Sequence, residues 1–153
     1  MRYRLVMVGK HERGYVQEGV RDYLGRIGRM ASLDEVVVPE AGAGGPEHQR
    51  RTEGTRLLQA LRPDEHVIAL DEGGTMLDSA AFSRRLAHLR DTGVRQVAFV
   101  VGGAYGLDDA VRQRADLVLS LSAMTFPHQL VRLIFVEQLY RALMIMRGSG
   151  YHH

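Results

Sequence analysis

Short apolar runs alternate along the chain with segments in which apolar residues recur at helical spacing. The runs lie at Tyr3 to Val8, Leu33 to Val38, His66 to Asp71, Val97 to Val101 and Leu117 to Leu121, and each has the length of a strand. The periodic segments are Gly14 to Ile27, Glu47 to Leu61, Asp78 to Arg90, a short one after Asp108, and Pro127 to Met146. This alternation predicts an α/β fold with a mostly parallel sheet and helices on both faces.

The last periodic segment, Pro127 to Met146, is apolar almost all round. His128 and Arg132 fall on one face of the predicted helix, and Glu137 and Arg141 fall on the other. A helix with only two narrow polar stripes must be covered on two sides. One cover is the chain's own sheet, and in a chain of 153 residues the simplest second cover is another copy. We therefore expect a homodimer.

Polar or glycine-rich loops follow the last three apolar runs. They are Leu70 to Gly74, Gly102 to Gly106 and Ser122 to Thr125. Because the carboxyl ends of neighbouring parallel strands lie together, these loops are predicted to build one pocket. Glycine lets a backbone approach a flat ligand closely, so that N–H and C=O groups can recognise its edge. Each loop taken alone also fits a tight connection between a strand and a helix.

Two common nucleotide motifs are absent. No segment fits the P-loop pattern G-x-x-x-x-G-K-[ST]. A dinucleotide fold would place an acidic residue at the end of the strand that follows the glycine turn, but that strand ends Ser120-Leu121-Ser122. The chain has no cysteine, which excludes disulfides and thiolate metal sites, and its scattered histidines predict no metal site.

Composition and charge indicate a single domain over residues 1–153 in the cytoplasm. No apolar run approaches the roughly 18 residues of a membrane span, and the first residues fit a strand better than a signal peptide. The net charge is only +2, yet Met1 to Met30 contains seven Arg and Lys against three acids. This asymmetry permits a nucleic-acid face, although arginines on a solvated helix explain it equally well.

Several sequence phrases resemble one family. VIALDEGGTMLDS, FVVGGAYGL, LSLSAMTFPHQLVR, EQLYRA and the final YHH are similar to the ribosomal RNA large-subunit methyltransferase H proteins, which methylate N3 of a pseudouridine. The resemblance runs from the first strand to the last residue. It implies a SPOUT-type fold with a C-terminal trefoil knot, an obligate homodimer, S-adenosylmethionine as cofactor, and large-subunit (23S) ribosomal RNA as substrate. We expect that substrate to be the assembled ribosome. Periodicity alone does not predict a knot.

The resemblance also implies which residues bind the cofactor. They are Leu70, Gly102, Leu121, Ser122, Ala123, Met124, Thr125 and Phe126. All of them lie in or beside the three loops described above. The family usually ends in Tyr-His followed by Lys or Arg, whereas this chain ends Tyr151-His152-His153. A histidine is at most partly charged at neutral pH, so a phosphate contact by the last side chain is weakened.

Methyl transfer from a sulfonium needs alignment with the acceptor and removal of the N3 proton, but no metal. The candidate catalytic residues are Arg132, Tyr151, His152 and His128. His128, at the helix start, fits either a base or a structural hydrogen bond. Arg132 is expected to hold a phosphate or a carboxylate. The resemblance implies that the tail with Tyr151 and His152 folds over the partner's pocket.

A function of a different class fits the same charge pattern. A non-catalytic ribosome- or RNA-binding protein would keep the basic N-terminal surface and would need no cofactor loops. Stabilisation by S-adenosylmethionine distinguishes the two functions, because only the enzyme requires a cofactor site.

Overall fold

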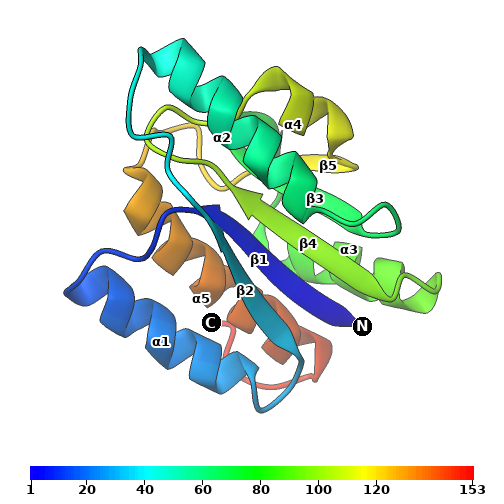
Figure 1. The fold of residues 1–153 in the computed structure, drawn as a ribbon. Coiled ribbons are helices and arrows are strands. Elements are labelled where there is room, and N and C mark those ends of the chain that lie inside the picture. The colour runs from blue at the N-terminus through cyan, green and yellow to red at the C-terminus, as the bar shows by residue number, and fades with distance from the viewer.

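A five-stranded parallel sheet lies at the centre of the computed structural model, which describes residues 1–153 (Figure 1). The strands are β1 (Arg2–Val8), β2 (Leu33–Val38), β3 (His66–Met76), β4 (Gln96–Val101) and β5 (Leu117–Ser120). The helices are α1 (Tyr15–Ile27), α2 (Pro46–Ala60), α3 (Ser79–Asp91), α4 (Asp109–Arg114) and α5 (His128–Met146). The spatial strand order is β2-β1-β4-β3-β5, and every neighbouring pair is parallel.

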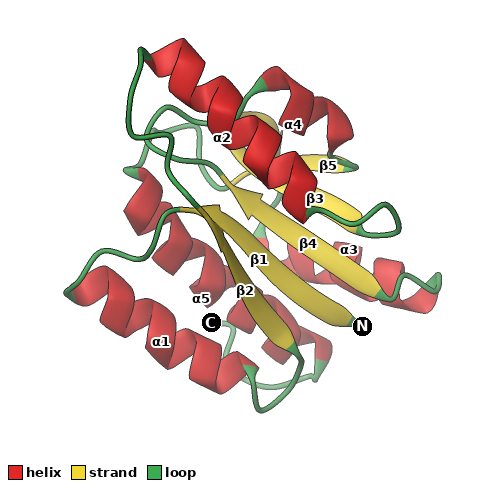
Figure 2. Ribbon diagram, viewed as in Figure 1, coloured by secondary structure: helices red, strands yellow, loops and turns green.

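Helices cover both faces of this sheet (Figure 2). Helices α1, α3 and α5 pack on one face, where Leu5 and Met7 of β1 join a core that includes Phe99 and Phe135. Helices α2 and α4 pack on the other face. There the alternate β1 residues, such as Val6, are buried. Since strands buried on both faces are apolar at every position, they appear in the sequence as continuous apolar runs. The predicted fold class is confirmed.

Strand β3 is longer than the sequence indicates. We predicted a strand ending at Asp71 and a turn at Glu72 to Gly74, but the strand runs from His66 to Met76. Leu70 and Thr75 both lie opposite Leu119 of β5, so the residues between them bulge out of the ladder. A β-carbon at Gly74 would lie 2.5 Å from the Val118 carbonyl oxygen, which explains why the bulge needs glycine there.

Helix α5 is flanked by α1 and α3 of the same chain. A β-carbon on Gly19 of α1 would lie 2.6 Å from Leu133 Cδ1 of α5. On the other side, Ser83 Oγ of α3 donates to the Ala142 carbonyl oxygen at 2.8 Å. Leu139 is 0% exposed without any second copy. The burial of Leu139 therefore requires no second copy, whereas Leu130 and Ile134 remain partly exposed in the single chain, and the homodimer stays a prediction.

The connection from β5 to α5 crosses the end of the sheet. β5 is an edge strand, yet Gln129 Nε2 near the start of α5 donates to the Lys10 carbonyl oxygen, just beyond β1, at 3.1 Å. Because β3 and β4 lie between β5 and β1, residues 121–127 pass over the carboxyl ends of these two strands. This crossing brings the third predicted loop to the other two. The trefoil knot stays a prediction.

Candidate active site

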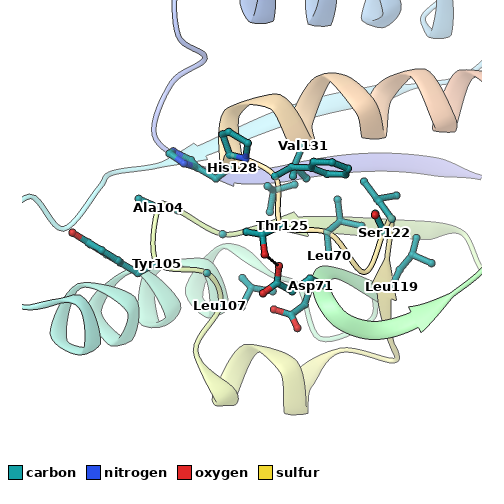
Figure 3. Close-up of a pocket in the computed structure, with 18 of the residues that line it drawn as sticks. Leu70, Asp71, Ala104, Tyr105, Leu107, Leu119, Ser122, Thr125, His128 and Val131 are labelled. Atoms are coloured by element: carbon teal, nitrogen blue, oxygen red, sulfur yellow. Dashed lines mark hydrogen bonds between the residues drawn. The ribbon is translucent and has the colours of Figure 1, made fainter.

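A pocket of about 650 Å³ lies at the carboxyl ends of β3, β4 and β5 (Figure 3). The three predicted loops and the start of α5 line it. Of the cofactor positions implied by the resemblance, the lining includes Leu70, Gly102, Leu121, Ser122, Met124, Thr125 and Phe126. Ala123 does not line the pocket and is exposed. The expectation that strand-end loops meet in one place is confirmed by this geometry.

The loop after β4 folds back on itself. Gly103 and Gly106 form an isolated antiparallel bridge, and the Gly106 N–H donates to the Gly103 carbonyl oxygen at 3.1 Å. A β-carbon at Gly102 would lie 2.8 Å from the Gly106 carbonyl carbon and oxygen. We expected glycine here so that a ligand could approach closely. The structure gives a nearer reason, because any side chain at this position would prevent the loop from closing.

Carboxylates form one wall of the pocket, and the sequence reasoning did not identify them as site residues. Asp71 Oδ1 accepts a hydrogen bond from Arg112 Nη2 of α4 at 3.0 Å. Glu72 Oε2 accepts from the Thr125 hydroxyl at 2.6 Å, which joins the β3 bulge to the crossing segment (Figure 3). In the sequence, the polar loop after Leu70 was the feature that could have indicated Asp71 and Glu72 as site residues. Arg112 had no sequence signal, because only the packing of α4 brings it to the pocket.

The turn between β5 and α5 is held by its own side chains. The Met124 N–H donates to Ser122 Oγ at 3.0 Å, and Ser120 Oγ donates to the Ser122 carbonyl oxygen at 2.8 Å. These bonds fix the backbone of the segment that crosses the strand ends. Met124 itself is 74% exposed, so it forms part of the pocket mouth.

His128 is the first residue of α5 and lines the pocket. Burial lowers the pKa of its imidazole, and the nearby positive charge of Arg132 lowers the pKa further. Glu12, Glu40 and Glu53 oppose these effects more weakly. The ring is therefore neutral at pH 7, which is the state that can accept a proton.

Arg132 lies behind the pocket and not in it. Its side chain is 0% exposed, and Nη1 donates to the Gly9 carbonyl oxygen at 2.9 Å while Nη2 donates to the Val8 carbonyl oxygen. Burial lowers the pKa of this guanidinium. We expected Arg132 to hold a phosphate or carboxylate. The structure corrects this, because both Nη groups satisfy carbonyls left unpaired where β1 ends.

The C-terminal tail packs on its own α5, away from its own pocket. The Tyr151 hydroxyl donates to Glu137 Oε1 at 3.3 Å, and its ring lies 4.8 Å from the Tyr140 ring. Glu137 also forms the expected i, i+4 ion pair with Arg141 at 2.6 Å. Partial burial, with Tyr23 and Glu137 nearby, raises the pKa of the Tyr151 hydroxyl to about 12. This phenol stays protonated at neutral pH and donates hydrogen bonds.

His152 lies beside Tyr151, where its Nδ1 is 3.4 Å from Arg141 Nη1. Glu137, the residue that Tyr151 contacts, is roughly 14 Å along the helix from His128, at 1.5 Å per residue. The tail therefore does not reach the pocket of its own chain in this structure. His128 is the one predicted catalytic residue that lines the pocket.

No group of three or more His, Cys, Asp or Glu side chains is placed to hold a metal ion. No helix combines the length and apolar character required to cross a bilayer.

Comparison with known proteins identifies the class to which this fold and pocket belong. A family model described as predicted SPOUT methyltransferase matches residues 1–152, and the chain belongs to that family. Within it, the Ribosomal RNA large subunit methyltransferase H of Geotalea daltonii is 42% identical over 153 residues, which is 100% of both chains. The protein of the same name from Leuconostoc citreum is 36% identical over 160 residues, covering 99% of each. The resemblance found in the sequence is thus confirmed.

A solved structure shares the fold at low sequence identity. It is a probable methyltransferase from Bordetella pertussis Tohama I, with a TM-score of 0.57 and 17% identity, covering 93% of this chain and 96% of that one. At this identity the likeness concerns the fold alone. It agrees with the parallel sheet and its two helical layers.

Proposed function

We propose that the protein is an S-adenosylmethionine-dependent methyltransferase that modifies N3 of a pseudouridine in the large-subunit ribosomal RNA of assembled ribosomes. The observation that carries the proposal is the pocket at the ends of β3, β4 and β5 in a chain of the SPOUT methyltransferase family. Full-length relatives named Ribosomal RNA large subunit methyltransferase H support the substrate. A ribosomal substrate places the protein in the cytoplasm.

The pocket residues fit this cofactor. The volume of about 650 Å³ lies in the range of ligand pockets. Leu70, Leu119 and Val131 supply apolar walls, and the 102–106 loop supplies backbone groups for a heterocycle. Two carboxylates against the single Arg112 favour a cationic ligand. When bound, S-adenosylmethionine supplies an electrophilic methyl group, and the chain supplies alignment and a proton acceptor.

Of the predicted catalytic residues, His128 is the one that can act as proton acceptor at the pocket, because its pKa is lowered and it lines the pocket. Arg132 acts as a positioning residue: it fixes the first turns of α5 against the end of β1. Gln129 adds to this attachment by accepting the Glu12 N–H at 2.9 Å. The position of His128 therefore depends on contacts made by the next turn of the same helix.

A saturating cofactor is expected to stabilise the native protein. At 100 times its dissociation constant, S-adenosylmethionine should add about 2.7 kcal/mol to the free energy of unfolding. Thermal unfolding with and without the cofactor measures this, and adenosine with free methionine is the control. Transfer of a radiolabelled methyl group to ribosomes then tests the reaction. A chain that binds ribosomes without cofactor stabilisation would instead be a non-catalytic binding protein.

The pH dependence of methyl transfer should report His128. A base must be neutral to accept a proton, so the rate falls as pH drops through its pKa. Because burial and Arg132 lower that pKa below the ordinary value of 6.5, activity should persist at pH 6.5 and fall only in more acidic buffer. His128→Ala should remove this acid limb along with most activity. An unchanged profile in the variant would exclude His128 as the base.

We infer that Tyr151 and His152 serve the partner's pocket in a homodimer, because they lie away from their own. Mixing a Gly102→Val chain with a chain truncated after Ser149 should then restore activity, since one pocket in each heterodimer is complete. Sedimentation verifies dimerisation, and differently tagged chains verify heterodimers. Verified heterodimers without activity, or a wild-type protein that remains a 17.1 kDa monomer at micromolar concentration, would contradict the shared site.

A further inference from the structure

We propose that four arginines at the amino-terminal edge of the sheet bind the phosphate backbone of the RNA substrate, at a surface separate from the pocket. In the spatial order of β1, β4, β3 and β5, they are Arg2, Arg95, Arg62 and Arg114, and we call them the arginine row. The row lies at the end of the sheet where Figure 1 marks the N-terminus, opposite the strand ends that form the pocket. This inference rests on the proposed function for the identity of the polyanion.

Contacts between neighbouring segments make the arginine row continuous. The Arg2 N–H donates to the Arg95 carbonyl oxygen at 2.8 Å, which joins β1 to β4. Arg62 Nη1 donates to Gln96 Oε1 at 3.3 Å, and Arg114 Nη2 donates to the Arg62 carbonyl oxygen at 3.1 Å. Adjacent strands of a sheet are about 4.8 Å apart. The edge therefore presents a line of cations to a chain of phosphates.

The charges of the row are largely available. Arg2, Arg62 and Arg95 are exposed and form no ion pair, and Arg114 has a distant one with Asp116 at 3.7 Å. Four arginines with only one distant ion pair thus line this edge, in a molecule whose net charge is only +2.

Helix dipoles account for only part of this arrangement. In a parallel α/β fold the helices end at the amino-terminal edge of the sheet, where their dipoles favour cations. Arg62 follows the end of α2, and Arg114 is the last residue of α4. Arg95 lies four residues beyond the end of α3, outside the last turn in which the dipole acts, and Arg2 begins β1. Their presence needs another explanation, and a polyanionic partner supplies one.

The opposite edge cannot supply the same attraction. Around the pocket, Asp71 and Glu72 line the wall, and the charges of Glu12 and Glu40 partly oppose the lowering of the His128 pKa. Negative charge there suits a cationic cofactor but repels phosphates. RNA held at the pocket must therefore gain affinity elsewhere on the protein. A large folded substrate can contact the arginine row and present one base to a pocket at the same time.

The test compares two double variants of equal charge. Arg2→Gln with Arg95→Gln removes two cations of the row, and Arg13→Gln with Arg21→Gln removes two exposed, unpaired cations elsewhere. The probe is a fluorescent 20-nucleotide polyuridylate, titrated over a range of salt concentrations. Each phosphate contact to a single strand contributes about 0.7 to the slope of the logarithm of the binding constant against the logarithm of the salt concentration. Loss of two contacts should therefore reduce this slope by about 1.4 in the row variant only. The control pair should match the wild type.

Ribosome methylation gives the second measurement. The row variant should raise KM for ribosomes on the order of tenfold at low salt, with kcat and cofactor affinity unchanged. Equal effects of the two pairs, no effect of the row pair, or an unchanged KM would overturn the proposal. If the wild type binds polyuridylate through the row but methylates no ribosomes, the proposed function fails while the polyanion surface stands.

Discussion

Arg132→Ala is expected to lower the free energy of unfolding by about 3 to 5 kcal/mol, the range for deleting a large buried side chain and leaving its partners unpaired. The side chain is among the largest that are fully buried in the chain. Its removal leaves the Val8 and Gly9 carbonyl oxygens without donors and opens a cavity between β1 and α5. For a domain of this size such a loss is a large part of the total stability.

Urea denaturation of the apo protein measures this effect. Arg132→Lys is the matched variant, because it keeps the charge and most of the volume but offers one ammonium in place of two Nη groups. We expect an intermediate loss for lysine. Arg141→Ala serves as a control, because its ion pair with Glu137 lies at the partly exposed surface of the same helix. A loss below about 1 kcal/mol for Arg132→Ala would show that water replaces the two hydrogen bonds.

The sequence was sufficient to place the pocket, because the apolar runs that mark the strands can be recognised from neighbouring residues alone. The strands that we predicted to end at Asp71, Val101 and Leu121 are almost continuously apolar, so they could be recognised as buried parallel strands. Parallel strands share one carboxyl edge, so the loops that follow them had to meet. Nothing beyond strand direction was required. The pocket lined by Leu70, Gly102 and Ser122 follows from that rule.

What the sequence could not show depends on which segments meet in space. Arg132 resembled a substrate-binding residue because a charged side chain on an apolar helix needs a polar partner. Its partners are backbone carbonyls that lie far away in the sequence. The flanking of α5 by α1 and α3 was hidden in the sequence for the same reason. The β3 bulge escaped notice because Gly73 and Gly74 are equally typical of a turn.

Gly102→Val is expected to reduce S-adenosylmethionine affinity at least 100-fold, or about 2.7 kcal/mol. The first added carbon would lie 2.8 Å from the backbone of Gly106 and 3.1 Å from Leu107 Cδ2. Backbone atoms cannot move aside as the end of a flexible side chain can. The 102–106 loop must therefore change its conformation, which breaks the bridge between Gly103 and Gly106. That movement displaces one wall of the pocket and removes the backbone groups proposed to recognise the heterocycle.

Isothermal titration of the folded variant decides this prediction, with circular dichroism to confirm the fold. Gly102→Ala adds only the first carbon and should already weaken binding, which keeps the test meaningful if valine unfolds the chain. Gly45→Val is the matched control, because its β-carbon meets nothing within 4 Å and its φ of −72° suits any residue. Wild-type affinity in a folded Gly102→Val protein would mean that the loop after β4 is not part of the cofactor site.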